Sequence, residues 1–183
     1  NIYIVDLDKD FCKVDRIAFS GISSTAAGTA YPVSIRVFEA DACAVTNCTF
    51  NGISWGVWVT STDANSKQPK GTQVKNNTFY DMTGPVADKG GYGILSTYND
   101  GIDISGNHFL GTSRHCIYIS DNSRNFSVSG NDCRGSRLSP LAFNSGTIPG
   151  HYVGPGKAFG NQLLCGGTPD PDSHGITMTG AMR

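Results

Sequence analysis

The sequence predicts an all-β fold, a single-stranded parallel β-helix of about six rungs in which each turn of chain stacks on the next. Two observations predict it: a six-residue motif recurs along the 183 residues, and an alternating apolar segment follows the copies. Successive copies start 24 to 31 residues apart, so a fixed unit recurs with insertions of variable length. Solenoid repeats have this pattern, because each turn buries its apolar face only against its neighbours.

Each motif starts with a small or β-branched apolar residue, has an inward polar site three positions later and ends on a bulkier core residue. The copies are VTNCTF, VKNNTF, ISGNHF, VSGNDC and AFGNQL, at residues 45–50, 74–79, 104–109, 128–133 and 158–163, preceded by a weaker VDRIAF at 14–19. Apolar alternation stops for two residues within the motif, which indicates a strand, a two-residue corner and a second strand. In the five stronger copies the first corner residue is Gly or Asn, the types that tolerate a left-handed backbone.

Two interior columns follow from this register. The inward polar site is Cys48 in the first strong copy and Asn in the others, namely Asn77, Asn107, Asn131 and Asn161. We expect these four side chains to form one ladder that satisfies buried corner amides. The final core positions should form a second stack, with members Phe19, Phe50, Phe79, Phe109, Cys133 and Leu163.

Alternating segments after the motifs predict a third strand for each turn. They cover residues 34–38, 56–60, 93–97, 116–120, 140–144 and 175–179. The predicted inward residues are Ile35, Val57, Ile94, Ile117, Leu141 and Ile176, which places Arg36, Trp58, Leu95, Tyr118, Ala142 and Thr177 outward. Residues 1–6 read as a further strand that begins within the fold.

Composition predicts one domain over residues 1–183 and excludes several classes of partner. With 38% hydrophobic and 16% charged residues the chain can bury an ordinary core. A net charge of −1 predicts neither nucleic-acid nor anionic-membrane binding. No apolar run approaches the roughly 20 residues of a membrane span, and the first residues lack a signal peptide's basic and apolar segments. Neither end shows an amphipathic cap, so we expect a piece of a longer protein.

The 6 cysteines suggest buried thiols rather than a disulfide framework. Cys12 and Cys43 occupy the same place before their motifs, so they should stack on adjacent rungs. A disulfide between them is compatible with a rung spacing of about 4.8 Å, whereas free Cys is commonly a small buried hydrophobe. The spacing matches no metal site, and we predict no metal or other cofactor.

The pattern V/I-x-G/N-N-x-F, a loop and then G-I-x-I resembles the right-handed parallel β-helix of the pectate-lyase-like superfamily. That superfamily includes polysaccharide lyases, bacteriophage tailspike depolymerases and alginate epimerases. The resemblance covers about residues 12 to 179 and is specific for the fold, since core and corner residues carry it. It implies that carbohydrate lies in a groove over the strands with Trp58 and Tyr118. Tailspike-like β-helices are commonly trimers, which implies a homotrimer.

The outward residues predict a polysaccharide site on these strands. Trp58 and Tyr118 lie two rungs apart, about 10 Å, close to the length of two sugar units in an extended glycan. Arg36, Tyr98 and His115 complete the predicted substrate-binding set. The alternative is that loops cover these rings as a satellite cluster.

The carboxylates Glu39, Asp63, Asp100 and Asp121 are the candidate catalytic residues. Glycosidases use two carboxylates about 5 to 10 Å apart, and Asp100 could pair with Asp63 or Asp121 if the loops keep register. The alternative is that each Asp caps its own turn.

Three functions remain open. The first is a tailspike-like depolymerase that binds and cleaves a surface or capsular polysaccharide, found in a virion or outside the cell after release. The second is a glycan-binding fibre segment without catalysis. The third is a lyase or epimerase directed at uronates, in which Lys89, Arg114 or His115 would act as the base or neutralise the uronate carboxylate.

Overall fold

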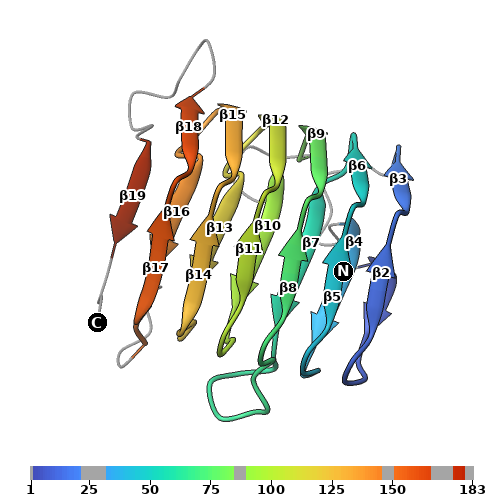
Figure 1. Ribbon diagram of the computed structural model, residues 1–183, viewed down its shortest axis with the longest axis vertical. Coiled ribbons are helices and arrows are strands. Elements are labelled where there is room, and N and C mark those ends of the chain that lie inside the picture. Colours follow the sequence, from blue (N-terminus) through green and yellow to red (C-terminus); the bar gives the residue numbers. More distant parts are fainter. Residues whose placement is uncertain (1, 22–31, 85–89, 146–150, 166–174, 180–183) are drawn as a thin grey trace.

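The computed structural model describes residues 2–21, 32–84, 90–145, 151–165 and 175–179, and within them every regular element is a strand. The chain winds through three parallel sheets, and Figure 1 shows their strands stacked in chain order from the N-terminal to the C-terminal side. The seven-stranded sheet contains β1 (Ile2–Leu7), β4 (Pro32–Phe38), β7 (Trp55–Thr60), β10 (Tyr92–Thr97), β13 (Ile117–Ser120), β16 (Leu141–Asn144) and β19 (Ile176–Thr179). The predicted right-handed parallel β-helix is confirmed.

The six-residue motif forms the other two sheets, one on each side of its corner. The second sheet contains β2 (Lys13–Asp15), β5 (Ala44–Thr46), β8 (Gln73–Lys75), β11 (Asp103–Ser105), β14 (Phe126–Ser129) and β17 (Gly156–Phe159). The third contains β3 (Ala18–Ser20), β6 (Thr49–Asn51), β9 (Thr78–Met82), β12 (His108–Thr112), β15 (Asp132–Ser136) and β18 (Gln162–Cys165). Between β8 and β9 only Asn76 and Asn77 intervene, so the predicted two-residue corner is correct.

The Asn ladder is present and continuous. Asn77 is 1% exposed; its Nδ2 donates to the Val45 carbonyl and to Asn107 Oδ1, at 3.0 Å in each case. Its backbone N–H also donates to Asn107 Oδ1, and the pattern repeats from Asn107 to Asn131 and from Asn131 to Asn161. Each amide therefore joins the rung before it to the rung after it, and no buried corner amide along this column lacks a partner.

The predicted interior stack is also confirmed. The rings of Phe19, Phe50, Phe79 and Phe109 lie in register with centroids 4.6 to 5.1 Å apart and planes within 8° of parallel. The same column continues through Cys133 and Leu163. Stacking at the rung spacing is possible because the strands hold the rings at that separation, and the column forms the centre of the core.

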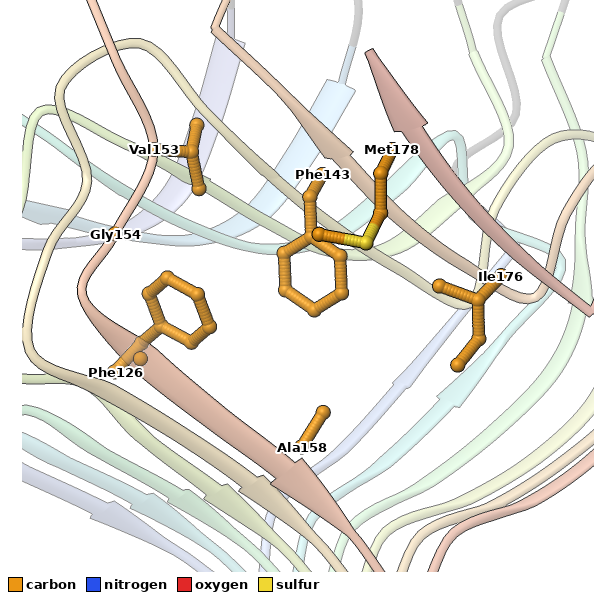
Figure 2. A pocket seen from close by; sticks show the side chains of 8 residues that line it. Phe126, Phe143, Val153, Gly154, Ala158, Ile176 and Met178 are labelled. Atoms are coloured by element: carbon orange, nitrogen blue, oxygen red, sulfur yellow. The ribbon is translucent and has the colours of Figure 1, made fainter. Parts of the chain in front are cut away.

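The core opens at the C-terminal turn. Ile176 and Met178 pair with the core positions Leu141 and Phe143, yet they are 48% and 63% exposed. Figure 2 shows their side chains, with those of Phe126 and Phe143, around an apolar pocket. This pocket is the end of the core, because inward side chains of the last described rung line it.

All cysteines in the described residues are free thiols, including Cys12 and Cys43. The interpretation as small buried hydrophobes therefore holds for Cys43, Cys48, Cys116 and Cys133, which are fully buried. Burial raises the pKa of the Cys43 and Cys48 thiols. Cys48 stands at the ladder position, where its backbone N–H donates to Asn77 Oδ1 at 2.9 Å.

Candidate functional site

The seven-stranded sheet presents one outward column along the whole solenoid. Its members pair rung by rung in the order Asp6, Arg36, Trp58, Leu95, Tyr118, Ala142 and Thr177. The predicted register of this face is therefore correct. Leu95, however, was expected to line an open groove and is only 6% exposed. It lies between the larger Trp58 and Tyr118 in the same column, and these rings leave little of it accessible.

A second outward column begins each strand and joins the first into an aromatic strip. We use this name for Tyr3, Trp55, Trp58, Tyr92, His115 and Tyr118. Neighbouring rings lie 5.2 to 6.3 Å apart, from the Tyr3–Trp58 contact through Trp55 and Tyr92 to the stacked pair of His115 and Tyr118. The contacts are mostly edge-on or tilted, and the strip crosses five strands from β1 to the entry of β13.

Glycines beneath the strip bring it close to the interior stack. A Cβ on Gly56 would lie 2.6 Å from the Phe79 ring, and one on Gly93 would lie 2.4 Å from the Phe109 ring. Gly is therefore required as the second residue of β7 and of β10, and the residue before it, Trp55 or Tyr92, lies on the outside. The core packing thus determines where the second outward column sits.

Hydrogen bonds hold two of the rings in place. Trp58 Nε1 donates to Thr97 Oγ1 at 3.1 Å, and Thr97 Oγ1 in turn donates to Thr60 Oγ1 at 2.7 Å. Asn144 Nδ2 donates to the Tyr118 hydroxyl at 2.8 Å. Both rings are half-buried, so one part is anchored and the other is accessible. Such preorganised aromatic surface costs little conformational entropy when a ligand binds.

Arg36 is held against the N-terminal end of the strip. Its guanidinium lies 3.9 Å from the Tyr3 ring centroid and 4.3 Å from that of Phe38, and its Nε donates to Asp6 Oδ1 at 2.9 Å. The hydrogen bonds that Arg36 donates to Asp6 raise the Arg36 pKa. The predicted binding cation is thus already paired, and it acts as a flat extension of the aromatic surface.

His115 is the most buried polar member of the strip. Burial lowers the pKa of the imidazole to about 4, and its Nδ1 lies 2.5 Å from the Ser139 carbonyl. The ring is consequently neutral near pH 7 and cannot neutralise a uronate carboxylate by charge. Arg114 lies beside it with its guanidinium 5.1 Å from the Tyr92 ring centroid, whereas Lys89 lies outside the described residues.

The structure does not align Asp63 with Asp100, one of the predicted catalytic pairs. Asp63 is exposed and accepts backbone N–H bonds from Asn65 and Ser66, which caps its own turn. Asp100 aligns with Lys70 and Arg124 rather than with Asp63, and Arg124 Nη2 donates to its carboxylate at 3.2 Å. The loops therefore do not keep the register that pairing of Asp63 with Asp100 requires.

Glu39 and Asp121 share one corner column but lie on strands three rungs apart. That separation is about 14 Å, beyond the 5 to 10 Å used by glycosidase carboxylate pairs. Glu39 accepts hydrogen bonds from the backbone and hydroxyl of Thr62. Asp121 accepts a hydrogen bond from Ser120 Oγ at 3.0 Å and faces His151, a residue that the sequence patterns do not single out.

Tyr98 joins Asp121 and His151 at this corner. The Tyr98 and His151 rings meet edge to face with centroids 5.7 Å apart, and His151 Nδ1 lies 3.8 Å from Asp121 Oδ1. Burial, followed by the charges of Asp121 and Asp63, raises the Tyr98 pKa. The signal for Trp55 and Tyr92 was present in sequence as an aromatic residue before Gly56 and Gly93, but His151 follows an insertion that carries no repeat pattern.

Within the described parts of the chain, no group of three or more His, Cys, Asp or Glu side chains is arranged to hold a metal ion. None of the elements described is a helix long and apolar enough to cross a membrane.

Comparison with known proteins agrees with the geometry. A family model described as right handed beta helix region matches residues 10–145, which is most of the chain. Searches of curated proteins and of solved structures returned no significant match. On the family match and the three stacked parallel sheets, the chain belongs to the right handed beta helix family.

Proposed function

We propose that this protein binds an extended polysaccharide along the aromatic strip. The observation that carries the proposal is a run of six rings in mutual contact on one outer face of the solenoid. Aromatic faces stack on the apolar faces of sugar rings, and outward aromatic surface of this extent usually marks an interaction site.

The repeat of the solenoid suits a polymer. Trp58 and Tyr118 are half-buried and lie two rungs apart in one column, about 10 Å. Two sugar units of an extended glycan span a similar length, so a chain running along the solenoid axis can meet both rings.

The carboxylates support binding over two-carboxylate cleavage. Asp63 is held by its own turn and Asp100 by Arg124, and Glu39 and Asp121 lie on strands three rungs apart. A lyase or epimerase for uronates has less support, because His115 is neutral and Arg36 is paired with Asp6.

The resemblance of the core repeats to another β-helix family also suggests a source for the glycan. Their resemblance to tailspike β-helices supports a surface or capsular polysaccharide of a bacterial cell, and a place in a virion or outside the cell after release. A homotrimer belongs to the same proposal and would be measured by the mass of the particle in solution.

A binding assay on bacterial surface polysaccharides tests the proposal. Wild type and Trp58→Ala are titrated against a panel of capsular and cell-wall polysaccharides, followed by calorimetry on those that bind. Trp58→Ala should weaken binding by about 1 to 3 kcal/mol, as expected for a stacking aromatic. The matched control is Phe11→Ala, because Phe11 is an aromatic residue that is 81% exposed and lies away from the strip.

Two results would contradict the proposal. One is the absence of binding by wild type to every polysaccharide in the panel. The other is equal loss of affinity in Trp58→Ala and Phe11→Ala, which would mean that aromatic surface in general, rather than the strip, attracts the glycan.

A further inference from the structure

The corner that follows the seven-stranded sheet carries unusual residues in a left-handed backbone. Glu39, Tyr98 and Asp121 occupy this corner with φ of 51°, 50° and 44°. The corresponding positions of the ladder corner in the last three motifs are Gly106, Gly130 and Gly160. Glycine adopts this conformation without cost, whereas a non-Gly residue there costs on the order of 1 kcal/mol or more. The residues at the corner that follows the seven-stranded sheet therefore carry a backbone penalty.

Three segments converge at this corner. Tyr98 follows β10, Asp121 follows β13, and His151 comes from the segment before β17. The His151 side chain is 13% exposed, and its Nδ1 lies 3.8 Å from Asp121 Oδ1 without a hydrogen-bond partner in the described part of the chain. Asp–His pairs used in catalysis are often this long before substrate binds. Ser120 Oγ holds the other Asp121 oxygen, so the carboxylate is oriented.

The cluster lies beside the aromatic strip. Asp121 follows Tyr118 by three residues, about 10 Å along an extended strand, and Tyr98 follows Leu95 by the same interval. A polar column lies between the corner and the strip, and its members are Thr60, Thr97, Ser120 and Asn144. Thr97 accepts the Trp58 hydrogen bond, and Asn144 donates to the Tyr118 hydroxyl. A glycan that runs along the solenoid axis on Trp58 and Tyr118 lies parallel to the corner and about 10 Å from it, so a branch of that glycan reaches the corner.

We propose that Tyr98, Asp121 and His151 form a hydrolytic site that cleaves the glycan held on the aromatic strip. This proposal rests on the proposed binding function, because the strip must place the scissile bond at the corner. In this site an Asp–His pair and an aromatic hydroxyl take the roles that two carboxylates have in most glycosidases.

The roles follow from the contacts. His151 is the general base and takes a proton from a water molecule whose oxygen attacks the anomeric carbon. The bond from that carbon to the bridging oxygen breaks, its electron pair stays on the bridging oxygen, and the Tyr98 hydroxyl supplies the proton to that oxygen. The proton on His151 then returns to Tyr98 through solvent, so one water is consumed for each bond cleaved. Asp121 is a positioning residue that orients His151.

The charge at the corner favours hydrolysis of a neutral glycan over elimination from a uronate. Glu39, Asp63 and Asp121 have no Lys or Arg partner within salt-bridge distance among the described residues, whereas Asp6, Asp100 and Asp103 each have one. Elimination needs a cation to neutralise the uronate carboxylate. Carboxylates without a Lys or Arg partner would instead repel the negatively charged uronate.

Cleavage is tested on the glycans that wild type binds. The assay measures new reducing ends and, in parallel, the ultraviolet absorbance of the unsaturated product that elimination would form. His151→Ala should lower the rate of reducing-end formation by on the order of 10²- to 10⁴-fold with unchanged glycan affinity. The matched control is His108→Ala, since His108 pairs with Asp132 at 3.1 Å at the start of β12 in the third sheet. That variant should cleave as wild type does.

Asp121→Asn and Tyr98→Phe separate the roles. Without the carboxylate, His151 is no longer oriented, so Asp121→Asn should lower kcat while glycan affinity is retained, and Asp121→Glu should restore the rate. Tyr98→Phe keeps the ring contact and should lose rate. If His151→Ala fails to fold, His151→Gln replaces it, with native circular dichroism as the criterion.

The outcomes separate the two proposals. Glycan binding without new reducing ends overturns the hydrolytic site and leaves the binding function standing. Full activity in His151→Ala or His151→Gln, or an unsaturated product, overturns it as well. Failure of wild type to bind any glycan contradicts the binding function itself.

Discussion

The aromatic column inside this solenoid and the aromatic strip on its outer face differ in composition, ring geometry and exposure. The inner column repeats one residue type, and the rings of Phe50, Phe79 and Phe109 are parallel within 8° and fully buried. The outer strip mixes Trp, Tyr and His, with interplanar angles up to 89°. Four of its rings are half-buried, whereas Tyr92 and His115 are buried. Uniform stacking serves packing, whereas varied and partly accessible rings serve recognition.

The largest expected effect is in the inner column. Phe79→Ala should lower the free energy of unfolding by about 3 to 5 kcal/mol, because it leaves a cavity between two stacked rings. Denaturant unfolding measures the loss. Phe159→Ala is the control, since Phe159 is 60% exposed, and its cost should stay within about 0.5 kcal/mol. A cost below about 1 kcal/mol for Phe79→Ala would show that the inner column does not carry the core.

The next effect concerns His115, which like Tyr92 is a buried member of the outer strip. Its folded pKa of about 4 lies below the ordinary value of 6.5, so the unfolded chain binds a proton first as the pH falls. Stability from this group is complete above pH 6.5 and is lost between about pH 6.5 and 4, by roughly 3 kcal/mol.

Denaturant unfolding at pH 7 and pH 4 measures this loss. His115→Phe keeps an aromatic ring in the strip and removes the titration, so its stability should fall less over the same interval. Equal losses in the two proteins would mean that the His115 ring is solvated in the folded state.

The ladder beside the inner column should respond more than any exposed Asn. Asn107→Ala leaves the Asn77 backbone N–H and the Val74 carbonyl without their partner, and each buried group left unsatisfied costs about 1 to 3 kcal/mol. Thermal unfolding compares it with Asn51→Ala, an exposed Asn at the end of β6, which should be near neutral. Matching midpoints for the two variants would contradict a structural role of the ladder.

The smallest effect is expected at the outer rings. Tyr118→Phe removes the acceptor of the Asn144 Nδ2 hydrogen bond, so it should cost about 0.5 to 1.5 kcal/mol of stability. The stacking face remains, and glycan affinity measured by calorimetry should be unchanged. Affinity that falls as far as in Trp58→Ala would show that the hydroxyl, rather than the ring, binds the glycan.

The inner columns could be predicted from sequence because their members recur at fixed positions within the six-residue motif. Asn77, Asn107 and Asn131 recur at a fixed place in the motif, and a one-residue slip would expose every core side chain. The outward register of Trp58 and Tyr118 follows from the same alternation. Burial of Leu95 could not be predicted from alternation alone, because it depends on how far the neighbouring rings extend.

The corner and its loops lie beyond what periodicity can predict. The insertion after β7 differs in length from the one after β10, so counting residues placed Asp63 level with Asp100, whereas the bridges align Asp100 with Lys70 and Arg124. His151 reaches Asp121 through a contact between residues 30 positions apart, with no repeat to predict it. Such contacts depend on loop geometry, which side-chain patterns do not encode.

The ladder also shows that the distance between rungs does not depend on the number of residues in a turn of the solenoid. Asn77 and Asn107 are 30 residues apart and Asn107 and Asn131 only 24, yet the amide contacts are 3.0 and 2.9 Å. Two turns of the solenoid can therefore differ by six residues while the ladder contacts between their rungs are unchanged. The segments between the strands can change in length without a change in the frame that carries them.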